Sequence, residues 1–364
     1  MFDVEVALRE LVAKTGSDLH LKVGSKPLFR VDGNLAAQQD GPVLSAQDTE
    51  HALEVLLTQN SKLDEFAREH EVDFSFEIPD LARYRLNAFH QRGVISIAVR
   101  AIPHRISTIA ELALPDVVRD LAEEERGIVL LTGTTGSGKS TTLAAMIDHM
   151  NETTSRHIVT IEDPIEFVHE DKRSVINQRE VGMDTASFKR ALRRVLRQDP
   201  DVILVGEMRD LETISTALTA AETGHLVFAT LHTQDAAQTI DRVIDVFPSH
   251  QQGQVRVQLS VALQGIMTQQ LLPTADGSGR VVATEVLVPN PAIRNLIREG
   301  KTHQIYSVLQ TSSAQGMQTM DTSLASLVRA GKINQKLAEA RSSTPDELRR
   351  LLGAESLGLG QQAA

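Results

Sequence analysis

The spacing of apolar residues divides the chain into two parts with different periodicities. In the first hundred residues, apolar groups recur at helical spacing over 2–14 and 45–70, and the second helix starts at Ser45 with Asp48 three positions on. The remaining stretches alternate with period two, which predicts antiparallel strands over 17–24, 27–33, 71–78, 82–90 and 94–102. Residues 1–100 are therefore predicted to form a compact α+β domain.

Beyond this domain, Pro103 ends the last strand and the periodicity stops, so residues 101–108 are predicted to be a linker. From Gly127 on, apolar strands alternate with helices, with strands over 127–132, 157–161, 202–206 and 225–230 and helices over 139–150, 185–198 and 210–222. This order is typical of an α/β fold whose parallel sheet is covered on both faces and carries its site at the carboxyl ends of the strands.

The second domain is predicted to span residues 109–352. Its last part should be mostly helical over 235–273, extended over 280–288 and helical again to about 352. The segment 353–364, rich in Gly, Gln and Ala, is predicted to be a flexible tail.

Composition narrows the class of protein. A chain of 364 residues with 41% hydrophobic and 23% charged residues is an ordinary globular protein with room for two domains. Apolar runs are too short to cross a membrane, and the first residues lack the layout of a signal peptide. The absence of cysteine excludes disulfides and thiolate metal sites, which fits the cytoplasm. A formal net charge of −11 disfavours nucleic acid as a partner, although a basic lining inside a ring could still hold it.

The strongest chemical signal is the glycine-rich turn at residues 133–140, which lies between a predicted strand and a predicted helix. This is the phosphate-binding loop pattern in its expected context, where main-chain N–H groups and the helix start hold a chain of phosphates. Lys139 is expected to reach the β- and γ-phosphates of ATP, and Ser140 to offer its hydroxyl to Mg²⁺. The predicted nucleotide-binding residues are Gly133, Thr134, Thr135, Gly136, Ser137, Gly138, Lys139, Ser140 and Thr141.

Two other strand ends carry carboxylates, which a triphosphatase needs near Mg²⁺ and the attacking water. Residues 162–166 hold three acidic groups around Pro164, either as part of the site or as a solvated turn. The predicted strand 202–206 ends in Gly206, where P-loop enzymes usually carry an Asp, and Glu207 follows it. Glu207 could act on Mg²⁺ through a water or on the attacking water itself. Alternatively, Asp210 caps the next helix and Glu207 only complements its dipole.

His225 and His232 frame a predicted strand and lie too far apart to bind one metal ion together. Either histidine could have a purely structural role. Alternatively, His232 and Thr230, at the end of a strand that faces the nucleotide, sense the γ-phosphate.

Basic residues gather in two sets, each either solvated surface or arginines that enter a neighbouring subunit's site. The first set lies on one predicted helix and comprises Lys189, Arg190, Arg193, Arg194 and Arg197. The second comprises Arg83, Arg85, Arg92 and Arg100.

Four motifs occur in a fixed order: the glycine-rich loop at 133–140, an acidic box at 162–166, the Gly206–Asp210 segment and a histidine box at 224–233. Their order and sequences resemble the motifs of secretion-superfamily ring ATPases, and most closely those of type IV pilus retraction motors. The resemblance runs from Phe2 to about Lys332, with supporting stretches at 17–21, 191–201, 217–224 and 291–301. It implies a homohexamer with a PAS-like first domain, a RecA-like ATPase domain and C-terminal helices. ATP and Mg²⁺ would be its cofactors.

The resemblance also implies roles for individual residues. Glu166 corresponds to the general base, Glu207 to the glutamate that works with Mg²⁺, and His225 and His232 to the histidine box. Arginines that complete the nucleotide site across domain or subunit boundaries correspond to Arg85, Arg100, Arg193 and Arg209. The segment 90–93 is a residue shorter than the family pattern, which leaves the role of Arg92 open.

The implied location is the cytoplasmic face of the inner membrane, without insertion. The implied partners are a pilus platform protein and a second retraction ATPase. The run 291–301 resembles the retraction signature, which favours a retraction motor over the accessory retraction ATPase. Alternatives of other classes are a RecA-like nucleic-acid translocase and a nucleotide-binding switch that does not hydrolyse.

Overall fold

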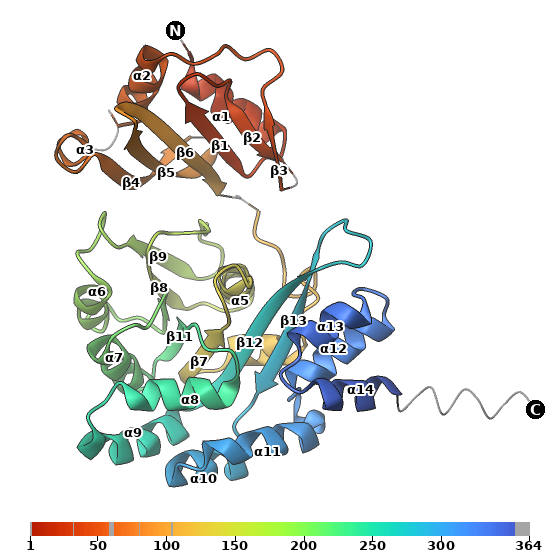
Figure 1. Cartoon of the computed structure of the whole chain (residues 1–364). Helices are drawn as coiled ribbons and strands as arrows, with labels where there is room; N and C mark the ends of the chain where they lie inside the picture. Colours follow the sequence, from red (N-terminus) through yellow and green to blue (C-terminus); the bar gives the residue numbers. More distant parts are fainter. Residues whose placement is uncertain (1, 32, 58–61, 80, 103–104, 354–364) are drawn as a thin grey trace, which may run out of the picture. The chain divides into compact units, whose positions relative to one another are not determined.

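The computed structural model describes residues 2–31, 33–57, 62–79, 81–102 and 105–353, which form two compact units that divide between Arg105 and Ile106 (Figure 1). Each unit contains one sheet and its own buried hydrophobic core. Part of the expected linker, residues 103–104, and nearly all of the expected tail, residues 354–364, lie outside the described residues.

The first unit is a six-stranded antiparallel sheet in the order β3-β2-β1-β6-β5-β4. The capping box predicted at Ser45 is confirmed, since Asp48 Oδ2 accepts the Ser45 N–H at 2.9 Å and Ser45 Oγ accepts the Asp48 N–H at 3.3 Å. The helical stretch 45–70 is two helices, and β3 is a strand that the alternation did not predict. The elements are α1 (Val4–Ala13), β1 (Asp18–Lys22), β2 (Leu28–Val31), β3 (Asn34–Ala37), α2 (Ala46–Leu57), α3 (Leu63–Glu69), β4 (Glu71–Ile78), β5 (Ala82–Gln91) and β6 (Val94–Ile102).

The second unit is built on a seven-stranded sheet in the order β13-β12-β7-β11-β10-β8-β9. All neighbours are parallel except β12 and β13, so the predicted parallel α/β core is confirmed. The first part comprises α4 (Val117–Glu123), β7 (Gly127–Thr132), α5 (Lys139–Thr153), β8 (His157–Glu162), β9 (Val175–Glu180), α6 (Phe188–Val195), β10 (Val202–Val205), α7 (Leu211–Glu222) and β11 (Leu226–Thr230).

The later part of the second unit completes the sheet and adds helices. It comprises α8 (Ala236–Asp245), α9 (Ser249–Ala262), β12 (Leu263–Pro273), β13 (Arg280–Leu287), α10 (Pro291–Glu299), η1 (Thr302–Gln304), α11 (Ile305–Thr311), η2 (Ser313–Gln315), α12 (Met320–Arg329), α13 (Gln335–Arg341) and α14 (Pro345–Gly353). Among the described residues, none of the helices combines the length and apolar character needed to cross a membrane.

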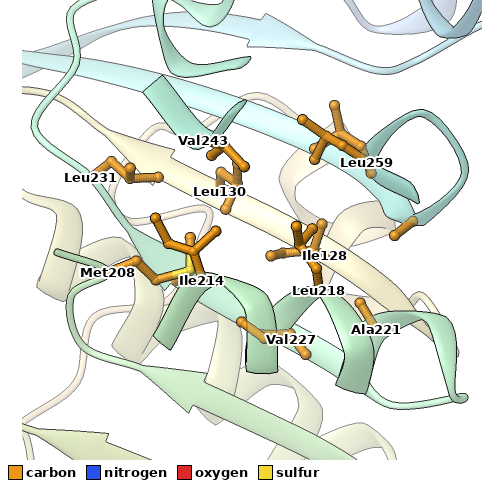
Figure 2. Close-up of a cluster of buried hydrophobic side chains, with 14 of the residues drawn as sticks. Ile128, Leu130, Met208, Ile214, Leu218, Ala221, Val227, Leu231, Val243 and Leu259 are labelled. Carbon is orange, nitrogen blue, oxygen red and sulfur yellow. The ribbon is translucent and has the colours of Figure 1, made fainter. Parts of the chain in front are cut away.

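Both faces of this sheet are buried, which explains the uninterrupted apolar runs of its strands. Along β7, Ile128 and Leu130 point into a cluster with residues of α7, α8 and α9, as Figure 2 shows. The alternate residues Val129 and Leu131 belong to a second cluster with α4 and α5. Because successive side chains of a strand face opposite sides, β7 contributes to the hydrophobic cores on both faces of the sheet.

One prediction about the second unit was wrong, and one strand was not predicted at all. Residues 263–273 were expected to be helical, but they form β12, which pairs with both β7 and β13. The strand β9 was not predicted because its polar sequence, Val-Ile-Asn-Gln-Arg-Glu, lacks an apolar face. In both cases pairing with distant strands decided the conformation, which local propensity does not report.

Candidate nucleotide site

The phosphate-binding loop connects the end of β7 to the start of α5, in the strand–turn–helix context that the sequence predicted. Gly133 has a φ of 132°, a conformation that favours glycine. A Cβ on this residue would also lie 2.4 Å from the backbone oxygen of Gln269 on β12. The close passage of β12 therefore requires glycine at the start of the loop.

The first turn of α5 offers unpaired backbone donors. Gly138 is the N-cap residue and supplies no side-chain capping bond, so the N–H groups of Lys139, Ser140 and Thr141 have no partner within the helix. These donors, the glycine-rich loop and the positive end of the helix form a cradle for a phosphate chain. The residues present therefore fit the nucleotide that the sequence predicted.

Lys139 lies inside this loop and is only 9% exposed. Its Nζ donates to the backbone oxygens of Gly133 at 2.8 Å and Thr134 at 3.1 Å. Burial lowers the pKa of Lys139, and the charges of Glu207 and Glu166 act in the opposite direction. The structure thus places both Glu166 and Glu207 within electrostatic reach of Lys139.

The acidic box follows β8, and its glutamates lie in different environments. The Glu162 carboxylate is enclosed, where Oε1 accepts hydrogen bonds from Thr160 Oγ1 at 2.6 Å and Gln178 Nε2 at 3.3 Å. Burial raises the pKa of Glu162, and the charge of Glu166 raises it further. Glu166 itself is exposed. The segment is therefore not a uniformly solvated turn, because one carboxylate holds the loop from inside and another faces solvent.

Gly206 directly follows β10, at a crowded point beside β8. A Cβ at this position would lie 3.1 Å from the backbone oxygen of Ile161 and 3.3 Å from Glu162 Cα, both on β8. An aspartate would crowd the neighbouring strand. The next residue, Glu207, carries the carboxylate at this strand end.

Glu207 is held by two cationic or polar neighbours. Its carboxylate accepts a hydrogen bond from Arg209 Nη2 at 2.6 Å, and His232 Nε2 lies 2.9 Å from its other oxygen. Burial raises the pKa of Glu207, but the bond from Arg209 and the charges of His232 and Arg209 together outweigh it, so the pKa lies below its usual value. Glu207 is thus kept ionised and oriented.

Asp210 fulfils the capping role proposed as an alternative. It accepts the N–H groups of Glu212 at 3.0 Å and Thr213 at 2.9 Å at the start of α7. The capping interpretation therefore holds for Asp210, whereas the side chain of Glu207 is directed to Arg209 and His232.

The two histidines separate along β11. Thr230 Oγ1 donates to the Gly206 oxygen at 2.5 Å and His232 contacts Glu207, so the carboxyl end of the strand joins the site. His225 directly precedes β11 rather than beginning it, and its Nδ1 lies 3.1 Å from the Ala220 oxygen at the end of α7. The structure does not bring His225 to the loop.

The predicted arginines also differ in their contacts. Arg193 and Lys189 of α6 both pair with Glu212 of α7, which ties two helices of the same unit together. Arg190, Arg194 and Arg197 are exposed.

In the first unit, Arg100 pairs with Asp18 at 2.9 Å. Arg85 lies on the neighbouring strand β5, opposite Arg100 in the register.

The sequence did not identify three polar groups that contact the site's segments. Gln178 and Glu180 of β9 bond to the acidic box. Gln269 of β12 donates to Thr142 Oγ1 at 2.9 Å in the first turns of α5. Their strands were not predicted, so no periodicity placed them near the loop. Within the described ranges, no group of three or more His, Asp or Glu side chains could hold a metal ion on its own.

The parallel sheet, the loop at the carboxyl end of β7 and the carboxylates of the neighbouring strands define a P-loop ATPase with a RecA-like core. The chain belongs to the type II/IV secretion system protein family, whose sequence profile matches residues 3–340. The resemblance derived from the motifs is therefore confirmed.

Individual relatives match along nearly the whole chain. It is 51% identical over 335 residues to the type IV pilus retraction ATPase PilT of Pseudomonas aeruginosa, covering 92% of this chain and 96% of that protein. It is 42% identical over 356 residues to the type IV pilus ATPase PilU of the same organism, covering 97% and 93%. A crystal structure of the pilus retraction motor PilT with bound ADP matches with a TM-score of 0.89 and 48% identity, covering 96% of this chain and 100% of that one.

Proposed function

We propose that this chain is the motor ATPase that powers retraction of a type IV pilus and thereby twitching motility. The observation that carries the proposal is the 51% identity to the PilT retraction ATPase across 92% of the chain. The charges of Glu166 and Glu207 act on Lys139 of the phosphate-binding loop, which supports it. PilU is less similar, at 42% identity, so the accessory retraction ATPase is the second candidate.

In this proposal residues 133–141 bind the phosphates of ATP through backbone N–H groups. Lys139 exchanges the oxygens of Gly133 and Thr134 for phosphate oxygens. Glu166, exposed at the end of the acidic loop, takes the proton of the attacking water. Ser140 and Glu207 hold Mg²⁺, which supplies charge neutralisation on the phosphates when bound.

His232 and Thr230 connect this chemistry to the rest of the second unit. His232 contacts the Glu207 carboxylate, and Thr230 donates a hydrogen bond to the Gly206 oxygen. A change in the charge around Glu207 would therefore change the contacts that hold the carboxyl end of β11. Groups from separate strands that gather round a triphosphate and separate after cleavage are the usual basis of a nucleotide-driven motion.

The assembly that we propose is a homohexamer at the cytoplasmic face of the inner membrane. Heterologous contacts that close form such a ring. The arginines proposed to complete nucleotide sites across unit or subunit boundaries are Arg85, Arg100, Arg193 and Arg209. The other member of the histidine box, His225, is proposed to act in the assembled ring. A pilus platform protein and a second retraction ATPase are the proposed partners.

Glu166→Gln tests the hydrolytic role. The variant should bind ATP like the parent but release phosphate at least 100-fold more slowly, because the general base is lost. Lys139→Ala is the binding-deficient reference. Turnover near that of the parent would reject Glu166 as the base and direct attention to Glu207.

Deletion of the gene in its native host tests the motor role. The expected phenotype is cells with extended pili that no longer twitch, restored by the parent chain and not by Glu166→Gln. Restoration of retraction in a strain that lacks every other retraction ATPase distinguishes the main motor from the accessory one. ATPase activity that rises with added DNA at physiological salt would instead favour a translocase.

A further inference from the structure

The loop that carries Glu166 has no regular secondary structure, so other groups must fix its backbone. It lies beside β9, which runs parallel to β8 with Thr160 opposite Gln178 and Glu162 opposite Glu180. The carboxyl end of β9 is therefore next to the point where β8 ends and the loop begins. Residues 178 and 180 share one face of β9, since side chains alternate along a strand.

Gln178 uses its whole side-chain amide on this loop. Its Nε2 donates to the Phe167 oxygen at 2.7 Å and to Glu162 Oε1 at 3.3 Å. Its Oε1 accepts the N–H of His169 at 2.8 Å. One side chain thus bridges the start of the loop and two residues beyond Glu166.

Glu180 holds the other side of Glu166. Its carboxylate is on a side chain that is only 3% exposed, and Oε2 accepts the N–H of Ile165 at 3.1 Å. Ile165 is also buried, so without this acceptor its N–H would lose a hydrogen bond in a place that water does not readily reach.

We propose that Gln178 and Glu180 are positioning residues for hydrolysis, which clamp the backbone at residues 165 and 167 so that the intervening Glu166 is presented to the attacking water. The inference rests on the proposed role of Glu166 as general base. Both side chains bond to the segment that carries Glu166, so the clamp should affect the chemical step more than nucleotide binding. A base displaced by about 1 Å commonly costs on the order of a hundredfold in rate.

Glu180→Leu and Glu180→Gln in the full chain are the first pair of variants. Leucine removes the acceptor, and kcat for ATP hydrolysis should fall about 10- to 100-fold, while KM for ATP and Kd for ADP change less than about threefold. Glutamine keeps an oxygen that can accept the Ile165 N–H, so it should restore kcat to within about threefold of the parent. Gln178→Leu repeats the test from the other side of Glu166 and should lower kcat by a similar factor.

Asn177→Ala is the matched control. Asn177 is on the same strand but on the opposite face, where its amide contacts His157 Nε2 at 2.8 Å, and its loss should leave kcat within about twofold of the parent. A general weakening of β9 would lower kcat in this control as well.

The double variant Glu166→Gln/Glu180→Leu separates the clamp from other effects. If Glu180 acts through Glu166, the double variant should be no slower than Glu166→Gln alone. A further tenfold loss, or full activity of both Glu180→Leu and Gln178→Leu, would overturn the clamp. If Glu166→Gln itself retains turnover, the proposed base has failed. In that case, if Glu180→Leu still lowers kcat when Glu166→Gln is also present, Glu180 does not act through Glu166.

Discussion

Glu285 offers a quantitative test of the second unit, because it is a buried acid between two helix starts. Its side chain on β13 is 4% exposed, and its Oε1 accepts the N–H of Ala236 at 2.9 Å, at the first residue of α8. The backbone N–H of Met320, at the first residue of α12, bonds to the same carboxylate. Burial, with smaller contributions from the charges of Asp235 and Asp321, raises its pKa from 4.5 to about 7.

The sign of the pH effect follows from where the proton is bound. Between pH 4.5 and 7 the folded protein keeps a proton on Glu285 that the unfolded chain has released. The contribution of Glu285 to the free energy of unfolding therefore falls as pH rises through this window. A pKa difference of this size corresponds to about 3 kcal/mol.

Glu285→Gln removes the titration and keeps the shape of the side chain. The free energy of unfolding of the variant relative to the parent should rise by about 2–3 kcal/mol between about pH 5 and pH 8, as the parent alone loses stability. Urea unfolding followed by circular dichroism at both pH values measures this, with Glu125→Gln as the control for the same substitution at an exposed position. A difference that stays flat, or that falls with pH, would refute the reasoning.

Three further predictions concern single positions of the second unit. Gly206→Asp, which restores the residue usual in P-loop enzymes, should lower the melting temperature and reduce turnover at least tenfold because its Cβ meets β8; a variant as stable and active as the parent would contradict this crowding. Asp210→Ala should cost about 1 kcal/mol in urea unfolding through loss of the α7 cap, and Asp210→Asn should recover most of it, so equal losses in both variants would speak against capping. Ile293 is fully buried and Leu296 packs on the same cluster, and we expect Leu296→Ala to keep ATPase activity in vitro while slowing pilus retraction; normal twitching would disprove that coupling.

The structural features that the sequence predicted correctly are those determined by residues close to one another in the chain. The phosphate-binding loop was identified because β7, the glycines of the turn and Lys139 at the start of α5 are contiguous. The capping box at Ser45 and the antiparallel strands β4, β5 and β6 of the first unit follow from patterns only a few residues long. The family itself could be recognised because its motifs occur in a fixed order.

Tertiary structure decided what depends on distant pairing. β12 and β9 are strands because of their partners in the sheet, so a local reading assigned the first to helix and overlooked the second. The same pairing distinguishes Glu162, enclosed by Gln178, from the exposed Glu166, although both stand in one acidic run. It also brings His232 to Glu207 and leaves His225 at the opposite end of β11. Charge, spacing and turn chemistry are properties of a few adjacent residues, whereas burial and the choice of hydrogen-bond partner exist only once strands far apart in the chain lie side by side.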